Sequence, residues 1–328
     1  MTTKKTAGAA SASATSKKPA AKKPAAKKTP QKSTPAKAEE ETIQDQAPET
    51  STEETTATGT AAEAVIQDEQ DPGSENSQMP KGGGIMIVIP YVDKLAAGEE
   101  LLYAVRAWQK NLPELASIVI VGDSCSWFGK DIIHIPHKRV STNPQIDVAA
   151  KLATVIASDL VDEFFVWSND DIIPVSRVYP EDLLVRKAMG PIREKGAAGG
   201  EYRENSIRTN QALAKIGITK GFDFAAHVPV VFEKEKLART LADFACQKQG
   251  MLVSTLYFNT HYREDRPILL KDDATGSIMA AVRSSNPNPA ILARVFKERK
   301  FINFTDKGWP NVKPHLEKLF PEKSPLEK

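Results

Sequence analysis

The segment Ile85-Met-Ile-Val-Ile89 is an unbroken run of apolar, mostly β-branched side chains. A strand with one face in water alternates apolar and polar residues, whereas a strand covered on both faces reads as a continuous apolar run. The run therefore predicts a buried strand of a parallel sheet. Three later segments have the same character and predict further strands: 117–121, 132–135 and 163–167.

Segments with helical spacing lie between these runs. Over 98–111 and over 147–160, apolar side chains recur every three or four residues, as on one face of a helix. Strands that alternate with helices at short spacing are typical of an α/β fold with a mainly parallel sheet flanked by helices. Beyond these segments, the pattern predicts helices over 207–216, 233–246 and 286–300, a strand over 301–304, and a last helix ending near 320.

The composition changes sharply before this region. Residues 1–80 contain no Phe, Trp or Tyr; ten lysines and no acidic residue lie within 1–37, and twelve Asp or Glu with no Lys or Arg lie within 38–80. Such a segment cannot bury enough apolar surface to offset its chain entropy. We therefore expect a disordered tail over 1–84, basic and then acidic, followed by a folded, functional domain over 85–328.

The basic part of the tail repeats Lys-Lys-Pro-Ala-Ala between Lys17 and Lys28. A mobile chain of paired lysines binds polyanions by releasing counterions, without reading a sequence. A weak contact with a polyanion such as DNA is one interpretation, and a plain spacer is the other.

Several classes of protein are excluded by the sequence. Its longest apolar run is much shorter than the roughly 20 residues that a membrane helix needs, and no apolar signal core follows Lys4 and Lys5. The two cysteines are too few for a disulfide framework or a four-thiolate zinc site. Phosphate-binding Gly-rich loops and a nucleophile elbow are also missing. These features favour a cytoplasmic protein without a membrane span.

The densest polar cluster, Asn169-Asp170-Asp171, directly follows the apolar strand expected at 163–167. In open α/β sheets, ligands bind beyond the carboxyl ends of the strands. Adjacent carboxylates there are suitable ligands for Mg²⁺ or Mn²⁺, which bridges to phosphate oxygens. The alternative is a polar turn that caps the next element.

Other candidate residues lie near the ends of predicted elements. Tyr91 and Asp93 follow the first strand, so Asp93 either faces the same crevice or forms a turn. His227 lies in an apolar stretch and is either a core residue or a general acid/base. The guanidinium groups of Arg208 and Arg263 suit a diphosphate, although surface arginines are common.

Five segments resemble sequence motifs of the Stealth proteins. These proteins are sugar-phosphate transferases of capsule synthesis and are related to N-acetylglucosamine-1-phosphotransferase. The five segments follow one another in the same order as in the family and span nearly all of 85–325. The segments are 87–93 (IVIPYVD), 99–123, 164–172 (FFVWSNDDI), 227–237 (HVPVVFEKEKL) and 301–325.

This resemblance implies an α/β fold related to type-A nucleotide-sugar transferases. It also implies transfer of a sugar-1-phosphate from a nucleotide-sugar, usually a UDP-sugar, to a hydroxyl acceptor such as a polysaccharide. The positions that match family motifs are Asp93, Asn169, Asp170, Asp171, His227 and Asp306.

We expect Asp170 and Asp171 to hold the metal ion, and His227 to take the proton of the acceptor hydroxyl. Asp93 and Asp306 are the further catalytic candidates, and the expected substrate contacts are Asn169, Tyr91, Arg208 and Arg263. Two alternatives stay open. One is glycosyl transfer from the same donor, possibly to a polyanionic acceptor, and the other is a nucleic-acid-binding protein that acts through its lysine-rich tail.

Overall fold

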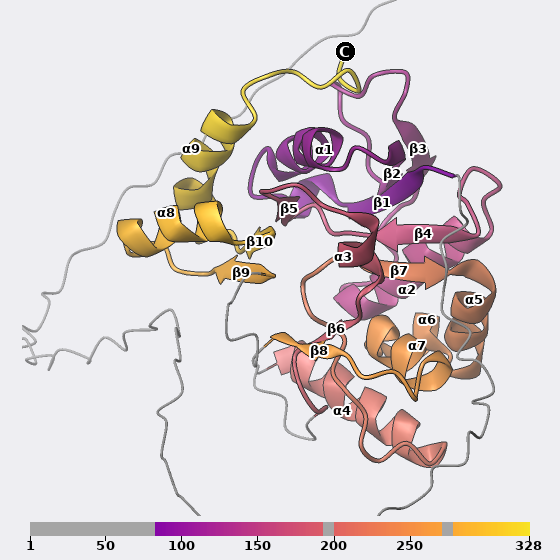
Figure 1. Ribbon diagram of the computed structural model, residues 1–328. Helices are drawn as coiled ribbons and strands as arrows, with labels where there is room; N and C mark the ends of the chain where they lie inside the picture. The colour runs from indigo at the N-terminus through magenta and orange to yellow at the C-terminus, as the bar shows by residue number, and fades with distance from the viewer. Residues whose placement is uncertain (1–82, 193–199, 271–277) are drawn as a thin grey trace, which may run out of the picture. The chain divides into compact units, whose positions relative to one another are not determined.

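The computed structural model describes residues 83–192, 200–270 and 278–328 (Figure 1). The tail, for which the sequence predicts disorder and weak polyanion contact, lies outside the described residues up to position 82. Within the described part, no helix is both long enough and apolar enough to cross a membrane.

A five-stranded sheet is the centre of the fold, with neighbouring strands in the order β3-β2-β1-β4-β7. β3, β2, β1 and β4 run parallel, and β7 runs antiparallel to β4. The order reverses between β1 and β4, which makes their carboxyl ends the topological switch point of the sheet. The strands are β1 (Ile85–Tyr91), β2 (Leu115–Gly122), β3 (Ile133–Pro136), β4 (Phe164–Trp167) and β7 (Val230–Glu233).

β1 is buried on both faces, as its continuous apolar run predicts. Ile87 and Ile89 belong to the hydrophobic core on one side of the sheet, and Met86 and Val88 to the core on the other. All four side chains are at most 7% exposed. The predicted α/β class with a mainly parallel sheet is therefore confirmed.

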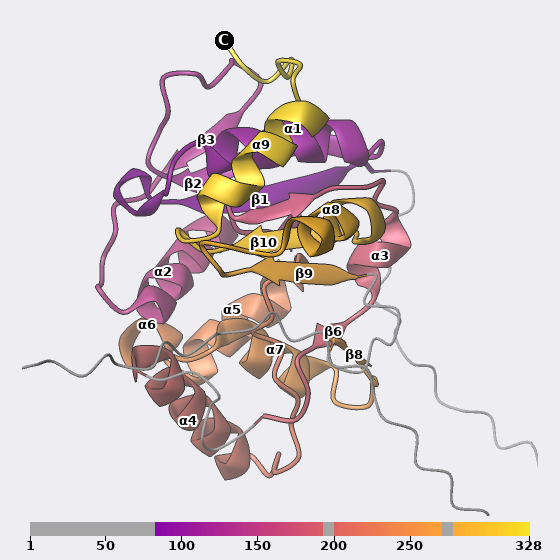
Figure 2. The same cartoon turned by 90° about the vertical axis from the view of Figure 1, so that its left-hand side faces the viewer.

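Helices cover both faces of this sheet (Figures 1 and 2). α1, α8 and α9 supply the core on one face, and α2, α4, α5, α6 and α7 supply the core on the other. The first group is α1 (Glu100–Asn111), α8 (Pro289–Glu298) and α9 (Trp309–Leu319). The second group is α2 (Pro144–Ile156), α4 (Gly200–Lys215), α5 (Lys234–Asp243), α6 (Cys246–Gln249) and α7 (Val253–His261).

Two smaller sheets complete the described fold. In the three-stranded one, β10 (Phe301–Phe304) lies between β5 (Ile172–Pro174), to which it is antiparallel, and β9 (Met279–Val282), to which it is parallel. β6 (Lys187–Ala188) pairs with β8 (Ile268–Leu269). The short helices are η1 (Asp93–Leu95) and α3 (Pro180–Leu184).

The structure differs from the sequence-based expectation at two helices. The helix expected over 233–246 is broken into α5 and α6 at Ala245, whose φ of 48° is left-handed and cannot continue a right-handed helix. α7 is a helix that periodicity did not predict. Its buried residues include every position from 255 to 259, so it has no polar stripe from which a helical period could be read.

We predict that Gly122→Ala destabilises the protein more than Gly217→Ala. Both glycines have positive φ, 142° and 81°. A Cβ at Gly122 would lie 1.9 Å from the carbonyl oxygen of Tyr91, whereas no atom of the described residues lies within 4 Å of one at Gly217. Gly217→Ala should reduce the free energy of unfolding by about 1–2 kcal/mol, the strain of the left-handed conformation alone.

Urea unfolding of both variants measures the difference. The added clash should make the loss at Gly122 larger by at least about 1 kcal/mol. Equal losses would show that the end of β1 does not constrain Gly122.

Candidate active site

The acidic turn is fixed by the pairing of β4 with β1. The amide of Ser168 donates to the carbonyl oxygen of Val88 at 3.0 Å, which extends the pairing one residue beyond β4, and Ser168 is fully buried. The amide of Ile172 then donates to the carbonyl oxygen of Asn169 at 3.2 Å and closes the turn. Asp170 and Asp171 are thereby held at the carboxyl edge of the sheet, beside the end of β1.

The end of β1 brings further polar groups to this edge. The hydroxyl of Tyr91 donates to Oδ1 of Asp93 at 3.1 Å, and the amide of Asp93 donates to Oδ2 of Asp123 at 3.0 Å. Burial, with Cys125 and Asp93 close by, raises the pKa of Tyr91, so its hydroxyl stays protonated and can donate. Tyr91 is the last residue of β1, and Asp93 is exposed at the start of η1, so the role of Asp93 at this edge stays a prediction.

The structure brings His227 against the acidic turn. Its Nδ1 lies 3.5 Å from Oδ2 of Asp171, and its side chain is 54% exposed. The carbonyl oxygen of His227 accepts a hydrogen bond of 3.0 Å from the side-chain amide of Asn303, which lies on β10 directly opposite Ile172. Because the Asp171 carboxylate favours the imidazolium form, it raises the pKa of His227.

Negative charge accumulates around the turn without full compensation. Burial, together with the charges of Asp171 and Glu100, raises the pKa of Asp170 to about 7. The Glu100 carboxylate is itself buried and accepts the amides of Ala97 and Gly98, at 2.7 and 2.6 Å. Oδ1 of Asp171 is buried and has no hydrogen-bond partner among the residues that the structure describes. A buried carboxylate oxygen without a partner is unfavourable unless a cation or a donor reaches it.

These two aspartates fit a divalent cation that is completed by other ligands. Among the described residues, no three His, Cys, Asp or Glu side chains come together as a metal site. Mg²⁺ typically takes one or two carboxylates and fills its shell with water and substrate phosphate oxygens. The donor set at Asp170 and Asp171 matches that pattern.

The remaining predicted residues lie elsewhere. Asp306 is exposed in the turn that follows β10, and Arg263 is exposed just beyond α7. Arg208 is on α4, where its guanidinium donates to Oδ1 of Asn205 and, at 3.4 Å, to the carbonyl oxygen of Gly250. No hydrogen bond or ion pair joins any of these three side chains to Asp171 or His227 in the described part of the chain.

Two residues at the site were not singled out by sequence reasoning. Asn303 positions His227, and Arg283, which directly follows β9, lies near enough to His227 to oppose the effect of Asp171 on its pKa. The signal that could have found them is the one that identifies Asp93 and Asp170, namely a polar residue in or just after a short apolar strand. Asn303 lies on β10 and Arg283 directly follows β9, both in the three-stranded sheet.

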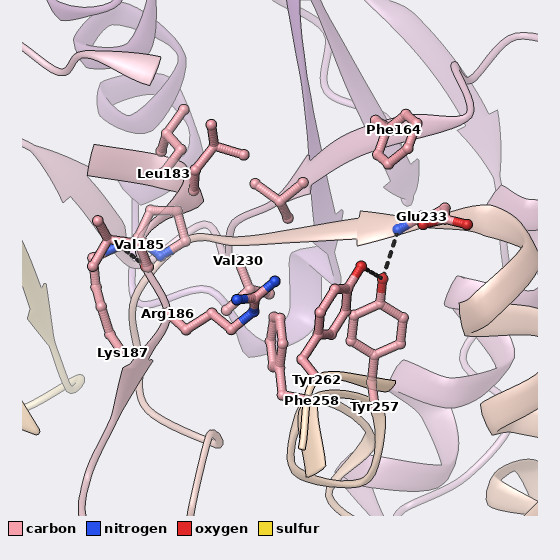
Figure 3. Close-up of a pocket in the computed structure, with 13 residues that line it drawn as sticks. Phe164, Leu183, Val185, Arg186, Lys187, Val230, Glu233, Tyr257, Phe258 and Tyr262 are labelled. Carbon is pink, nitrogen blue, oxygen red and sulfur yellow. Dashed lines mark hydrogen bonds between the residues drawn. The ribbon is translucent and has the colours of Figure 1, made fainter. Parts of the chain in front are cut away.

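A separate cavity lies between α3, β7 and α7 (Figure 3). Its polar groups are already paired: the Tyr257 hydroxyl accepts the amide of Glu233 at 3.0 Å, and the Arg186 guanidinium lies 4.0 Å from the centre of the Tyr262 ring and pairs with Asp265. None of the acidic turn residues lines it. The cavity is therefore internal packing at the β7 edge, apart from the acidic turn.

No protein-family model matches the chain, and no curated protein sequence matches it significantly. Similar solved structures include the galactosyltransferase LgtC in complex with donor and acceptor sugar analogues, at 12% identity and a TM-score of 0.42, covering 72% of this chain and 95% of that one.

Two further similar structures are glycosyltransferases. One is involved in glycosylation of the major capsid of PBCV-1, with 10% identity, a TM-score of 0.35, and coverage of 72% of this chain and 99% of that one. The other is GlyE of Streptococcus pneumoniae TIGR4, with 11% identity, a TM-score of 0.28, and coverage of 75% and 54%. Because all three TM-scores are below 0.5, the fold class is assigned from the strand order of the central sheet and not from these similarities.

We predict that Asp171→Asn lowers the pKa of His227. The neutral amide no longer favours the imidazolium, and the positive charge of Arg283 remains. In the native protein the pair stabilises the fold below the ordinary imidazole pKa, and this contribution is lost as the pH rises through the raised pKa. NMR titration of the His227 ring measures the shift.

Asp306→Asn is the matched control, because it removes the same charge from an exposed turn whose side chain forms no hydrogen bond or ion pair with His227 among the described residues. An unchanged His227 pKa in Asp171→Asn, or an equal shift in both variants, would contradict the pairing.

Proposed function

We propose that residues 85–328 form a metal-dependent transferase that moves a sugar-1-phosphate from a nucleotide-sugar to a hydroxyl group of an acceptor such as a polysaccharide. The observation that carries this proposal is the Asp171–His227 pair, with its 3.5 Å separation, at the switch point of an α/β sheet. That position is where such sheets bind ligands. The order of the Stealth-like motifs along the chain supports the same conclusion.

His227 is the proton acceptor in this scheme. With Nδ1–H directed at Asp171, Nε2 presents a lone pair, and the half-exposed ring is accessible to an acceptor hydroxyl. The hydroxyl oxygen attacks the phosphorus that carries the sugar, and its proton passes to Nε2. The bond between that phosphorus and the bridging oxygen of the diphosphate breaks, and a nucleoside monophosphate leaves. Asp171 stabilises the imidazolium that forms.

Asp170 and Asp171 are the residues that would hold Mg²⁺ or Mn²⁺. A cation there neutralises charge on the diphosphate when it is bound. Two observations support this role: Oδ1 of Asp171 has no hydrogen-bond partner in the described part of the chain, and the pKa of Asp170 is raised. Both indicate a site with more negative charge than its described protein surroundings compensate. Oδ2 of Asp171 faces His227, so the two oxygens of one carboxylate serve two different partners.

The donor would lie across the ends of β1 and β4. Asn169 on one strand end, and Tyr91 and Asp93 on the other, provide an amide, a phenol and a carboxylate for its sugar and nucleoside hydroxyls. The Stealth-like motifs favour a UDP-sugar. Asp306, Arg208 and Arg263 keep their proposed roles only if substrate binding brings these side chains to the turn.

We expect Asp171→Ala to abolish turnover while leaving the fold intact. The substitution removes both the proposed cation ligand and the carboxylate that orients His227, and a well-positioned general base contributes about 10²- to 10⁴-fold to a rate. Nucleotide release from a panel of nucleotide-sugars, with and without Mn²⁺, measures the effect.

Asp243→Ala is the control, since Asp243 is exposed at the end of α5 and should leave turnover unchanged. Substantial activity in folded Asp171→Ala protein would refute the assignment of the turn.

The released nucleotide identifies the bond that breaks. Transfer of a sugar-1-phosphate from a UDP-sugar yields UMP, because the diphosphate is split, whereas glycosyl transfer yields UDP. We expect UMP, measured by ion-exchange chromatography of the reaction mixture with an acceptor present. UDP as the primary product would assign glycosyl transfer to the same site instead.

A further inference from the structure

The segment that leads to His227 is hydrogen-bonded along two edges. On one edge, the amide of Met189 donates to the carbonyl oxygen of Asp223 at 2.8 Å. The amide of Asp223 in turn donates to the carbonyl oxygen of Gly190, also at 2.8 Å. In an extended chain, the polar backbone groups of neighbouring residues point to opposite edges. The groups of the two flanking residues, Phe222 and Phe224, therefore point away from residues 189–190.

Side chains of α7 bind these groups on the second edge. The amide of Phe222 donates to Oδ1 of Asn259 at 2.9 Å, and Nδ2 of Asn259 donates to the carbonyl oxygen of Phe222 at 2.7 Å. The amide of Phe224 donates to Oγ1 of Thr255 at 3.0 Å, and Oγ of Ser254 donates to the carbonyl oxygen of Phe224 at 3.0 Å. Three side chains of a helix thus take the place of a neighbouring strand.

The spacing of a helix explains why this pairing fits. Thr255 and Asn259 are four residues apart, which is about 6 Å along a helix axis. Phe222 and Phe224 are two residues apart, which is about 6.6–6.8 Å in an extended chain. The two repeats therefore nearly match over one step. We call Ser254, Thr255 and Asn259 the α7 ladder.

The α7 ladder is shielded from water. Thr255 is fully buried and Asn259 is 6% exposed. The Thr255 hydroxyl also donates to Oδ1 of Asp223 at 3.3 Å. A Cβ at Gly221 would lie 2.9 Å from Oδ1 of Asn259, so the backbone and the amide are in close contact. Because a buried backbone amide or carbonyl is unfavourable without a partner, the ladder fixes where residues 222–224 lie.

His227 follows the α7 ladder after three residues. The amide of Val228 donates to the carbonyl oxygen of Ala226 at 2.9 Å, which makes a tight turn at the histidine. On the other side, the side-chain amide of Asn303 donates to the carbonyl oxygen of His227 at 3.0 Å. The backbone at His227 is therefore held between α7 and β10, and its ring lies 3.5 Å from Asp171.

We propose that Ser254, Thr255 and Asn259 are positioning residues for the proton acceptor. They hold residues 222–224 in place, and through this segment they set the separation between His227 and Asp171. This inference rests on the proposed function, because it takes His227 as the group that accepts the proton. It assigns a role in catalysis to a helix that lies outside the switch point of the sheet and carries no group that touches the substrate.

Thr255→Val tests the α7 ladder, because valine has a similar shape and lacks the hydroxyl. We expect kcat for nucleotide release by the full chain to fall about tenfold to a hundredfold, the cost of a misplaced catalytic group. The KM for the nucleotide-sugar should stay unchanged, because the proposed donor contacts are not altered. Thr255→Ser keeps the hydroxyl and should keep the wild-type kcat.

Thr240→Val is the matched control. Thr240 is 1% exposed on α5, and its hydroxyl bonds the carbonyl oxygen of Lys236 and Nε2 of His261 rather than residues 222–224. Its kcat should equal that of the wild type. If Thr255→Val does not fold, Ser254→Ala removes only the hydroxyl that binds the Phe224 carbonyl and should lower kcat in the same way. An unchanged kcat in the folded ladder variant, or an equal loss in Thr240→Val, would overturn the positioning role.

The backbone amide NMR signal of His227, recorded at one fixed pH, separates this inference from the proposed function. It should shift in Thr255→Val and stay in place in Thr240→Val. A shift of this kind supports the positioning even if no nucleotide-sugar is turned over by the wild type, an outcome in which the transferase proposal fails. An unmoved His227 signal in Thr255→Val overturns the positioning, whatever the turnover.

Discussion

The parallel pairing of β4 with β1 is the constraint on which the site depends. It continues one residue past the strand through the hydrogen bond between Ser168 and Val88, in the fully buried interior. The chain turns directly after Ser168, which places the three polar residues Asn169–Asp171 at the carboxyl edge of the sheet. The turn leads directly into β5, whose pairing with β10 places Asn303 opposite Ile172 and so fixes the position of His227.

The site is distinguished by carboxylates whose negative charge is only partly compensated. Carboxylates from the ends of β1, β2 and β4 and from the start of α1 gather at one edge, and only part of their charge is compensated by protein groups. Concentrated charge of this kind is unfavourable for the isolated fold and is typical of sites that bind a charged partner. The imidazole of His227 lies at the margin of the acidic turn, with its Nδ1 3.5 Å from Oδ2 of Asp171.

The sequence predicts those parts of the molecule that depend on local pattern. The apolar runs identify β1 and β4, and the position of Asp170 and Asp171 after a strand identifies the acidic turn. The contact of Asp171 with His227 is different, because it depends on how the loop before β7 meets β10. From local sequence alone, His227 is equally consistent with a core residue, whereas its half-exposed ring in the structure fits a role at the surface of a site.

Other features also depend on tertiary packing and therefore could not be predicted from local sequence. α7 is buried nearly all round and therefore lacks a helical period. Arg208 has the residue type expected of a phosphate ligand, yet its hydrogen bonds hold together α4 and the loop at Gly250. Asn303 reaches the carbonyl oxygen of His227 only because β10 pairs with β5 and β9, a register that no local motif encodes.

In the proposed function, a divalent cation and a nucleotide-sugar meet at the ends of β1 and β4. Paramagnetic broadening of backbone amide NMR signals by Mn²⁺, with and without a UDP-sugar, tests this meeting point most directly. We predict broadening centred on Asn169–Asp171 and on Asp93, strengthened when the UDP-sugar is present. Broadening that is centred on other acidic residues, or that does not respond to any nucleotide-sugar, would contradict the account.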